Sequence, residues 1–563
     1  MTRNEATEKQ VLAARPKHST WLSANAGSGK TRVLTDRVAR LLLEQVQPQH
    51  ILCLTYTKAA ASEMQNRLFK RLGEWAMLGD DKLRLQLLEL GISGETSDED
   101  LRNARTLFAR AIETPGGLKI QTIHSFCSSL LRRFPLEARV SPQFAEMEER
   151  AAALLRAEIV QELAEGPETG VIRRVAHHFT GEDFDGLTAA IVNQRAALQS
   201  PLGPDQCLEL FDLDPGFDEE TLEALVFLGG EDHLLRDVIS HLEGGSSTDQ
   251  KAAAKLRLIP RLGLDSLPAL EGVFLFGQSA KSPFGAKIGS FPTKKTQGNM
   301  GTLLPKLEDF MRRVEDARTR RLALAAARRT HALQDFARVF LPAYEARKQQ
   351  MGWLDFDDLI LKARDLLTDP AVAAWVLYRL DGGIDHILVD EAQDTSPAQW
   401  KVIELLAQEF TSGSGARSEV ERTIFVVGDK KQSIYSFQGA DPGEFDRMQA
   451  EFAARLSATE KPLNEMELQF SFRSSHAILS LVDEVFKDRK ASGFHTGSEH
   501  RAFKHDLPGR VDLWPLVEKT GDEEDEDWAA PVDRLGAKPH TVLLAERVAR
   551  QIRRMIDEKE TIP

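Results

Sequence analysis

Short apolar runs of strand length alternate with helical patterns in the first and later parts of the chain. Continuous apolar runs of this length are typical of parallel strands that are buried on both faces of a sheet. Between two of them, Leu34, Val38, Leu41 and Leu42 recur at the spacing of one helix face. The alternation predicts an α/β domain with a parallel sheet. The runs occupy residues 19–23, 51–56, 119–123, 387–389 and 423–427.

The texture of the chain changes between residues 146 and 345, where Ala, Leu, Glu and Arg dominate and the pattern is mostly helical. Strand-type runs resume after this segment, so we interpret it as a helical domain inserted into the α/β domain. The predicted organisation is a first lobe over 1–145 and 346–462, the insertion over 146–345, and the beginning of a second lobe over 463–563.

Composition adds few restrictions to this picture. A chain of 563 residues has room for roughly three or four domains of ~150 residues each. Its net charge of −14 argues against a surface that binds polyanions everywhere, but a local basic groove stays compatible with it. No run approaches the ~20 apolar residues of a membrane span, so we expect no membrane partner. Cys53, Cys127 and Cys207 lack the spacing of a metal site, which favours idle thiols in a cytoplasmic protein.

One short segment carries specific chemistry, because a glycine-rich turn lies between an expected strand and an expected helix. The segment fits the phosphate-loop pattern G-x-x-x-x-G-K-[ST], with Ala24 in place of the first glycine. Gly27 and Gly29 permit a tight turn, Lys30 brings a positive charge to the β- and γ-phosphates, and Thr31 offers its hydroxyl to Mg²⁺. A chance glycine-rich turn is the alternative, and the strand–helix context argues against it. The predicted nucleotide-binding residues are Ala24, Asn25, Ala26, Gly27, Ser28, Gly29, Lys30 and Thr31.

Two later strand ends provide acidic and amide groups. The apolar run before Asp390 and Glu391 predicts that both carboxylates lie at the carboxyl edge of the sheet, where ligands of open α/β sheets bind. Asp390 would hold Mg²⁺, and Glu391 would orient and deprotonate the attacking water. Gln432, which follows the strand end at Asp429, could contact the γ-phosphate, although an ordinary polar loop is the alternative.

Taken together and in order, these motifs resemble the UvrD/PcrA/RecB class of superfamily 1 helicases. The resemblance spans nearly the whole chain and implies a RecA-like motor lobe, the start of a second RecA-like lobe, and the use of ATP with Mg²⁺. The motifs that carry it are Gln10 and residues 24–31, 54–64, 122–126, 354–359, 389–394, 427–435 and 470–474.

Within this class the chain is most similar to the AddA-type helicase–nuclease proteins. Three features carry this narrower resemblance: the loop at 23–31, an extra helical stretch near 73–111, and the run at 382–396. It implies 3′-to-5′ movement on single-stranded DNA, unwinding of duplex DNA in double-strand break repair and recombination, an AddB-like partner, and a nuclease elsewhere in the parent protein. A UvrD-like repair helicase without nuclease, or an ATP- and DNA-binding protein without turnover, are the alternatives.

The resemblance also implies roles for single residues around the nucleotide. Gln10 would read the adenine edge, while Arg32 and Phe472 would sandwich the adenine ring. Arg473 would stabilise charge on the γ-phosphate as an arginine finger; otherwise it is a surface arginine.

For DNA, the resemblance implies stacking by Tyr56, Tyr435 and Phe437, for which core packing is the alternative. Phosphate or sugar contacts are implied for Thr55, Thr57, Lys58, His124 and Ser125. Gln438 departs from the class, which usually has an arginine there.

Two further expectations concern less specific signals. Lysines and phenylalanines near 281–295, together with the basic run 312–329, could contact duplex phosphates, although a solvated helix face is the alternative. The later motifs of the class and the nuclease carboxylates do not occur before Pro563. We therefore expect a truncated second lobe, and slow ATP hydrolysis by residues 1–563 alone.

Overall fold

The structure of the chain is a computed structural model. Its residues group into two compact units, each of which has most of its contacts within itself. One unit comprises residues 1–143 and 356–563, and the other residues 144–355. The structure describes residues 4–92, 96–114, 117–179, 184–381, 384–410, 420–433, 441–457, 461–487, 489, 500–518 and 539–561.

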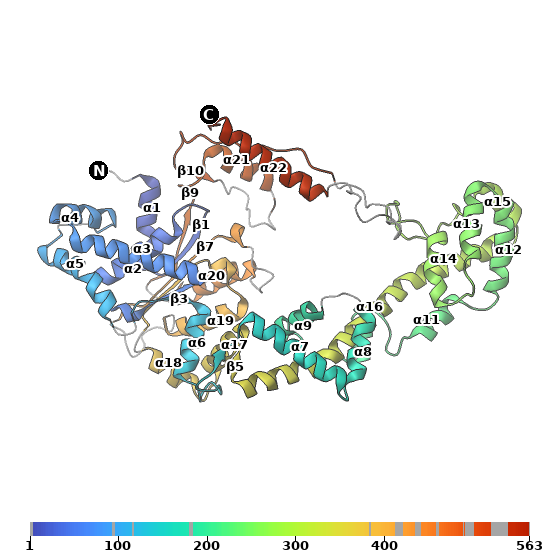
Figure 1. Cartoon of the computed structure of the whole chain (residues 1–563), viewed down its shortest axis with the longest axis horizontal. Helices are drawn as coiled ribbons and strands as arrows, with labels where there is room; N and C mark the ends of the chain where they lie inside the picture. Colours follow the sequence, from blue (N-terminus) through green and yellow to red (C-terminus); the bar gives the residue numbers. More distant parts are fainter. Residues whose placement is uncertain are drawn as a thin grey trace. The chain divides into compact units, whose positions relative to one another are not determined.

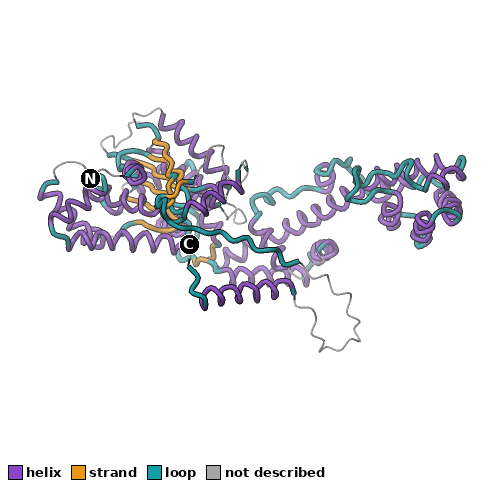
Figure 2. The backbone as a smooth tube through the Cα atoms, turned by 90° about the horizontal axis from the view of Figure 1, so that it is seen from above, coloured by secondary structure: helices purple, strands orange, loops and turns teal. Residues whose placement is uncertain are grey.

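The first unit is built on a six-stranded sheet, whose strands are orange in Figure 2. The strand order is β3-β2-β6-β7-β1-β8, and every neighbouring pair is parallel. All five predicted runs form strands in this sheet, with ends that differ by at most one residue, so the predicted α/β class is confirmed. The strands are β1 (Thr20–Ala24), β2 (Ile51–Thr55), β3 (Lys119–Thr122), β6 (His386–Val389), β7 (Thr423–Gly428) and β8 (Asn464–Leu468).

Strand β8 is the one member of this sheet that the hydrophobic pattern does not predict. Its sequence Asn-Glu-Met-Glu-Leu lies at the sheet edge beside β1, and four of its five residues are exposed or half-buried. An edge strand with a solvated face needs no continuous apolar run. The sheet therefore extends beyond residue 462, where the first lobe was expected to end.

Helices cover both faces of the sheet (Figure 1). On one face α2, α3, α4 and α5 pack against inward residues such as Leu22, Cys53 and Phe425. On the other, Trp21 of β1 stacks on Trp400 of α19 with ring centroids 5.7 Å apart. The helices of this unit are α1 (Glu5–Ala13), α2 (Lys30–Leu43), α3 (Lys58–Met77), α4 (Asp80–Glu89), α5 (Asp98–Glu113), α6 (Ile123–Arg133), α17 (Phe356–Thr368), α18 (Ala373–Asp381), α19 (Pro397–Ala407), α20 (Pro442–Ser457), α21 (His476–Phe486) and α22 (His540–Asp557).

A buried arginine ties α2 to the amino-terminal edge of the sheet. The Arg37 guanidinium donates to the His18 carbonyl oxygen at 2.7 Å and to Thr423 Oγ1 at 3.0 Å, and also bonds the Arg15 carbonyl. Its side chain lies over the Phe425 ring, 4.9 Å from the centroid. Burial lowers the pKa of Arg37 to about 9, so the side chain is still charged at neutral pH. Its charge is accommodated here by the carbonyl dipoles that surround it.

Replacing Arg37 by Met should therefore destabilise the first unit. The change leaves buried oxygens without donors, and we expect the free energy of unfolding to fall by roughly 2–4 kcal/mol. Denaturant unfolding followed by the fluorescence of the buried Trp21, Trp75 and Trp400 measures this. Arg102→Met on the exposed side of α5 is the matched control. Equal unfolding midpoints for the two variants would show that Arg37 does not stabilise the attachment of α2 to the sheet.

The second unit is almost entirely helical (Figure 2). It is organised along α16 (Leu303–Met351), a helix of 49 residues that is labelled in Figure 1. One apolar core packs on its first half around Phe310 and Val314, and another packs on its second half around Phe336 and Phe340. The other elements are α7 (Glu149–Glu165), α8 (Thr169–His178), α9 (Phe184–Asn193), α10 (Pro204–Glu209), α11 (Glu219–Val226), α12 (Glu231–Glu243), α13 (Ser247–Arg257), α14 (Leu267–Phe274), α15 (Lys294–Met300) and the short pair β4 (Ala145–Glu146) and β5 (Trp353–Leu354).

The limits of this unit differ from the 146–345 expected for the inserted domain, because α16 continues through residue 345 to Met351. A small strand pair, β9 (Phe470–Ser471) and β10 (Arg501–Ala502), completes the first unit. None of the helices that the structure describes combines the length and the hydrophobicity that a bilayer crossing requires.

Asp249 at the start of α13 is a buried carboxylate that joins α13 to the segment before α15. It accepts hydrogen bonds from the Thr293 backbone N–H at 3.0 Å, from Thr296 Oγ1 at 2.8 Å and from the Ser246 hydroxyl at 3.0 Å. Burial would raise the pKa of Asp249, but hydrogen bonds led by those of Thr293 outweigh it and lower the pKa to about 2. The folded state therefore favours the ionised carboxylate.

The stability of the second unit should consequently depend on pH in the acid range. Because the folded pKa of Asp249 lies below its unfolded value, its stabilising effect is complete above about pH 4 and is lost as the pH falls towards 2. We expect Asp249→Asn to destabilise this unit at pH 6 and to reduce the loss of stability between pH 6 and pH 3. Thermal unfolding at several pH values in this range measures the slope of stability against pH. An unchanged slope in the variant would contradict the assignment.

Candidate nucleotide and nucleic-acid site

Five segments with candidate functional residues meet at the carboxyl edge of the six-stranded sheet. Because all the strands are parallel, the residues that follow β1, β2, β3, β6 and β7 emerge at this edge. The order of the strands places β3 and β2 on one side of β6, and β7 and β1 on the other. The predicted DNA-binding residues after β2 and β3 therefore adjoin the predicted nucleotide-binding residues after β6, β7 and β1.

The loop between β1 and α2 requires glycine at two positions. Gly27 has φ +74° and Gly29 has φ +90°, values that side chains with a Cβ rarely adopt. A Cβ at Gly29 would lie 2.6 Å from Gln10 Nε2, and one at Gly27 would lie 2.8 Å from the Ser471 hydroxyl oxygen. The loop turns tightly and leads into the N-terminus of α2, a geometry suited to phosphate.

Lys30 and Glu391 form an ion pair across this edge, with 2.7 Å between Lys30 Nζ and Glu391 Oε2. The Lys30 side chain is only 10% exposed. Glu391 adopts the left-handed backbone conformation, with φ 50°, directly after Asp390. Gln393 Nε2 donates to the same Glu391 oxygen at 2.8 Å. The structure therefore brings together the lysine and the glutamate that the sequence places in separate motifs, and adds Gln393, to which no role was assigned.

Asp390 is held at the end of β6, where its backbone N–H bonds the Leu54 carbonyl oxygen of β2 at 2.9 Å. Burial, followed by the charge of Glu391, raises the pKa of Asp390 to about 7, against the opposing effect of Lys30. A divalent cation would favour the ionised carboxylate. The carboxylate of Asp390 and the hydroxyl of Thr31 are oxygen ligands of the kind that Mg²⁺ takes. Within the described ranges, no three His, Cys, Asp or Glu side chains form a metal cluster, and a Mg²⁺ bound mainly by phosphates and water needs none.

Gln10 closes one side of the phosphate loop. Its Nε2 donates to the Ser28 carbonyl oxygen at 2.8 Å, while its Oε1 is buried without a hydrogen-bond partner among the described residues. The Ser28 hydroxyl is likewise buried without a hydrogen-bond partner among the described residues. Unpaired buried acceptors are unfavourable, so a ligand with an amino group would satisfy Gln10 Oε1. These groups fit a purine nucleotide such as ATP.

Three further predicted nucleotide contacts lie at or near the loop. The Phe472 backbone N–H bonds the Gly27 carbonyl oxygen at 2.8 Å, and the Phe472 ring lies 4.4 Å from that of Phe503. Arg473 is exposed, and its guanidinium has no partner among the described residues. Arg32 is half-exposed, with Nε 3.8 Å from Asp36. The structure places Phe472 and Arg473 against the loop, and the proposed stacking of Arg32 and Phe472 on adenine stays a prediction.

Gln432 is oriented by the strand end before it. Its Nε2 donates to Asp429 Oδ2 at 2.5 Å, and the Asp429 backbone N–H in turn bonds Gln393 Oε1 at 2.8 Å. The amide is therefore coupled through Gln393 to Glu391. Its contact with a γ-phosphate stays a prediction.

The neighbouring Lys431 is a contact that sequence reasoning missed. Its ammonium bonds Asn25 Oδ1 of the phosphate loop and lies 3.2 Å from His500 Nε2. His500 is held through Nδ1 by Asp483 at 2.5 Å. The available signal was the position of Lys431 directly after a buried strand, but its partners are remote in sequence.

The predicted DNA-binding residues of β2 and β3 lie where those strands end. Thr57 is the N-cap of α3, where its hydroxyl accepts from the Ala60 N–H at 3.1 Å, and Lys58 beside it is exposed. His124 packs edge-on against Phe356, with ring centroids 5.5 Å apart.

The other members of this set have mixed environments. Thr55 is buried with its hydroxyl on the Thr57 carbonyl oxygen, Ser125 bonds Thr122, and Tyr56 is half-buried. Tyr435, Phe437 and Gln438 lie outside the described residues.

Some basic or aromatic residues of the two segments considered for duplex contacts take part in packing within the second unit, and the contacts with duplex DNA stay a prediction. Phe291 belongs to the apolar core, and Lys287 donates to the Val273 carbonyl oxygen. Along α16, Arg313 pairs with Glu231 at 2.8 Å and Arg321 pairs with Glu271 at 2.9 Å. Several of these charges therefore serve packing within the unit.

The family model of the UvrD/REP helicase N-terminal domain matches residues 4–453. The match covers five of the six strands of the sheet, all except β8, together with the phosphate loop, the Lys30–Glu391 pair and the helical unit. The chain belongs to the UvrD/REP helicase family.

Similar proteins carry a more specific name. The chain is 27% identical over 529 residues to AddA, an ATP-dependent helicase/nuclease protein, of Desulfitobacterium hafniense, a match that covers 85% of this chain and 36% of that protein. The proteins of the same name from Bacillus cereus and Bacillus mycoides are 27% and 26% identical, with 83% of this chain and 38% of each protein covered. The chain thus spans little more than a third of the length of these curated relatives.

The ATP site leads to a binding prediction. Lys30→Ala should weaken the binding of a fluorescent ATP analogue by roughly 10- to 100-fold, because one charge-assisted contact to phosphate is removed. Fluorescence titration in the presence of Mg²⁺ measures the affinity. Lys70→Ala, at an exposed lysine of α3, should bind the analogue as the unaltered chain does. Unchanged affinity in Lys30→Ala would show that the nucleotide binds elsewhere.

Proposed function

We propose that this chain is the motor part of an ATP-dependent DNA helicase that moves along single-stranded DNA in DNA repair. The Lys30–Glu391 pair carries the proposal, because it lies on the same sheet edge as the polar residues after β2 and β3. Membership of the UvrD/REP helicase family supports it.

In the proposed reaction, Lys30 exchanges its contact with Glu391 for the phosphates of bound ATP. The freed Glu391 carboxylate accepts a proton from the attacking water, whose oxygen forms the new bond to the γ-phosphorus as the bond to the leaving ADP oxygen breaks. Asp390 and Thr31 would hold Mg²⁺, which supplies charge neutralisation of the phosphate oxygens. Arg473 would stabilise the negative charge that develops on the transferred group.

DNA contacts are proposed for the residues at the ends of β2 and β3. Lys58 and His124 would contact backbone phosphates or sugars, and Tyr56 would stack on a base. Gln432 follows β7, which lies between β6 and β1 in the strand order, so it lies between Glu391 and the phosphate loop. Its bond to Asp429, and the bond of Asp429 to Gln393, give a continuous polar path to Glu391.

The narrower proposal follows the names of the similar proteins. We propose that the parent protein acts in double-strand break repair and recombination in the cytoplasm, moves 3′ to 5′, and pairs with an AddB-like protein. Any nuclease activity would lie outside the part of the relatives that this chain covers. A repair helicase without nuclease is the second candidate.

Hydrolysis can be tested on the chain itself under single-turnover conditions, with protein in excess over radiolabelled ATP so that a slow chemical step is still observed. We expect single-stranded DNA to accelerate phosphate release. Glu391→Gln should reduce that rate by roughly 10²- to 10⁴-fold while the binding of ATP is retained, because the general base is removed.

Glu113→Gln, at an exposed glutamate of α5, is the matched control and should keep the original rate. ATP binding with no hydrolysis, and with no influence of DNA, would favour an ATP-binding protein without turnover. Hydrolysis that survives Glu391→Gln would contradict the assigned base.

A further inference from the structure

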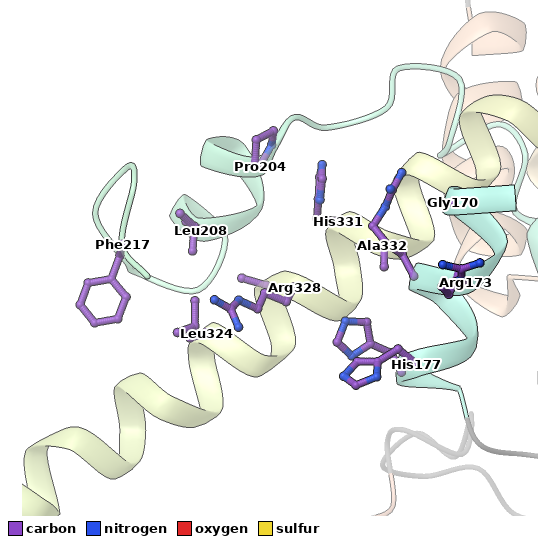
Figure 3. Close-up of a pocket in the computed structure, with 13 residues that line it drawn as sticks. Gly170, Arg173, His177, Pro204, Leu208, Phe217, Leu324, Arg328, His331 and Ala332 are labelled. Carbon is purple, nitrogen blue, oxygen red and sulfur yellow. The ribbon is translucent and has the colours of Figure 1, made fainter. Parts of the chain in front are cut away.

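A cavity of about 700 Å³ lies along α16 in the second unit, where α8 and α10 pack against that helix (Figure 3). It is separate from the phosphate loop, since all of its lining belongs to residues 144–355. Figure 3 shows Arg328 and His331 on the stretch of α16 beside the short helix α10, with His177 reaching from α8. A volume of this size is typical of pockets for small ligands.

The buried residues that line the cavity, which we call its floor, are apolar. Leu324 and Ala332 of α16 are 5% and 4% exposed, and Leu208 of α10 and Phe217 are similarly buried. The aliphatic and aromatic side chains come from separate segments of the chain, so the floor is a product of the tertiary fold. It offers an apolar surface for a planar ring.

The rim of the cavity is cationic. Its charged or titratable residues are arginines and histidines from two helices, and none of the described lining residues carries a carboxylate. They are Arg173, Arg174, His177 and His178 of α8, and Arg328 and His331 of α16.

Nearby carboxylates neutralise only part of this charge. Asp335 pairs with Arg174, and Glu219 pairs with Arg328. Arg173 is exposed and has no partner among the described residues. Burial, together with the charges of His177 and of the α16 arginines, lowers the pKa of His178, as expected where cations are crowded. An anion in the cavity would relieve this repulsion.

The combination of a cationic rim and an apolar floor selects the class of ligand. Arginine binds phosphate through paired N–H donors, and a planar base would cover the floor. We propose that this cavity binds one nucleotide, either as a free mononucleotide or as the phosphorylated 5′-terminal nucleotide of a DNA strand. This site goes beyond the proposed motor function and does not depend on the ATP site.

Binding can be measured on the full chain by isothermal titration with deoxythymidine 5′-monophosphate, without Mg²⁺. Thymidine and inorganic phosphate serve as probes that lack one half of the ligand. We expect the monophosphate to bind at least about tenfold more tightly than either half, since only the whole nucleotide satisfies both rim and floor. Equal affinity for inorganic phosphate would overturn the role of the floor and hence the proposal.

Two charge reversals locate the binding. Arg173→Glu at the rim should weaken the binding of the monophosphate at least about tenfold, because it replaces a charge that attracts the phosphate by one that repels it. Arg320→Glu, at an exposed arginine of α16 outside the cavity, should leave the affinity unchanged. Equal affinities of the two variants would overturn the proposal, and both variants alter exposed residues, so folding is preserved.

The source of the nucleotide is distinguished with oligonucleotides of one sequence, with and without a 5′-phosphate. If strand ends occupy the cavity, the 5′-phosphate should strengthen binding to the original chain, and Arg173→Glu should abolish that difference. If the difference is absent while the monophosphate still binds, a free nucleotide is the ligand. Failure of all probes here, with intact ATP hydrolysis, would refute this site and leave the motor proposal standing.

Discussion

The parallel direction of every strand in the six-stranded sheet is the constraint on which the candidate site depends. It sends the residues after five separate strands to one edge, although they are hundreds of positions apart in the sequence. The contact between Lys30 and Glu391 exists only because β1 and β6 are both neighbours of β7. The same constraint separates two sets of groups along the edge. The acidic groups and the predicted phosphate-binding groups lie around β6, β7 and β1, and polar groups follow β2 and β3. A reversed strand anywhere in this set would remove its residues from the site.

Much of this arrangement could be predicted from the sequence, because the signals are local. The buried strands are continuous apolar runs, and the phosphate loop needs its glycines, lysine and threonine at fixed spacing. Strand β8 lacked such a signal, since an edge strand tolerates Asn464, Glu465 and Glu467. The end of the helical unit was placed too early. The pattern of α16 runs unbroken past the expected boundary to Met351, and Gly352, its left-handed C-cap, was the local signal close to the change of unit at residue 355.

The contacts that connect one motif to another could not be predicted, because they are set by the tertiary fold. Gln393 was part of a recognised motif, yet its bonds to Glu391 and to the Asp429 backbone follow from the proximity of β6 and β7. Lys431 reaches Asn25 across the sheet edge because β7 and β1 are neighbours. Arg328 of the cationic cavity lies in the basic run 312–329 noted in the sequence, but the cavity residues of α8 that accompany it are remote in sequence. An arginine on a helix looks the same in the sequence whether it faces a carboxylate, as Arg321 does, or an open pocket.

Helix α2 is held at its first residue and again near its middle. Lys30 is tied to Glu391, while Arg37 is surrounded by backbone carbonyls and Thr423 at the opposite sheet edge. The Arg37 contacts do not involve the phosphate loop, so we expect α2 to keep its place on the sheet when Lys30 exchanges Glu391 for phosphate. We expect displacement linked to the nucleotide in side chains and in the segment after β8, which meets the loop through the Phe472 backbone bond to Gly27 and the Asn25 side-chain bond to the Gln469 carbonyl oxygen. On this view the sheet and α2 form the rigid part of the first unit, and the part that moves begins after β8.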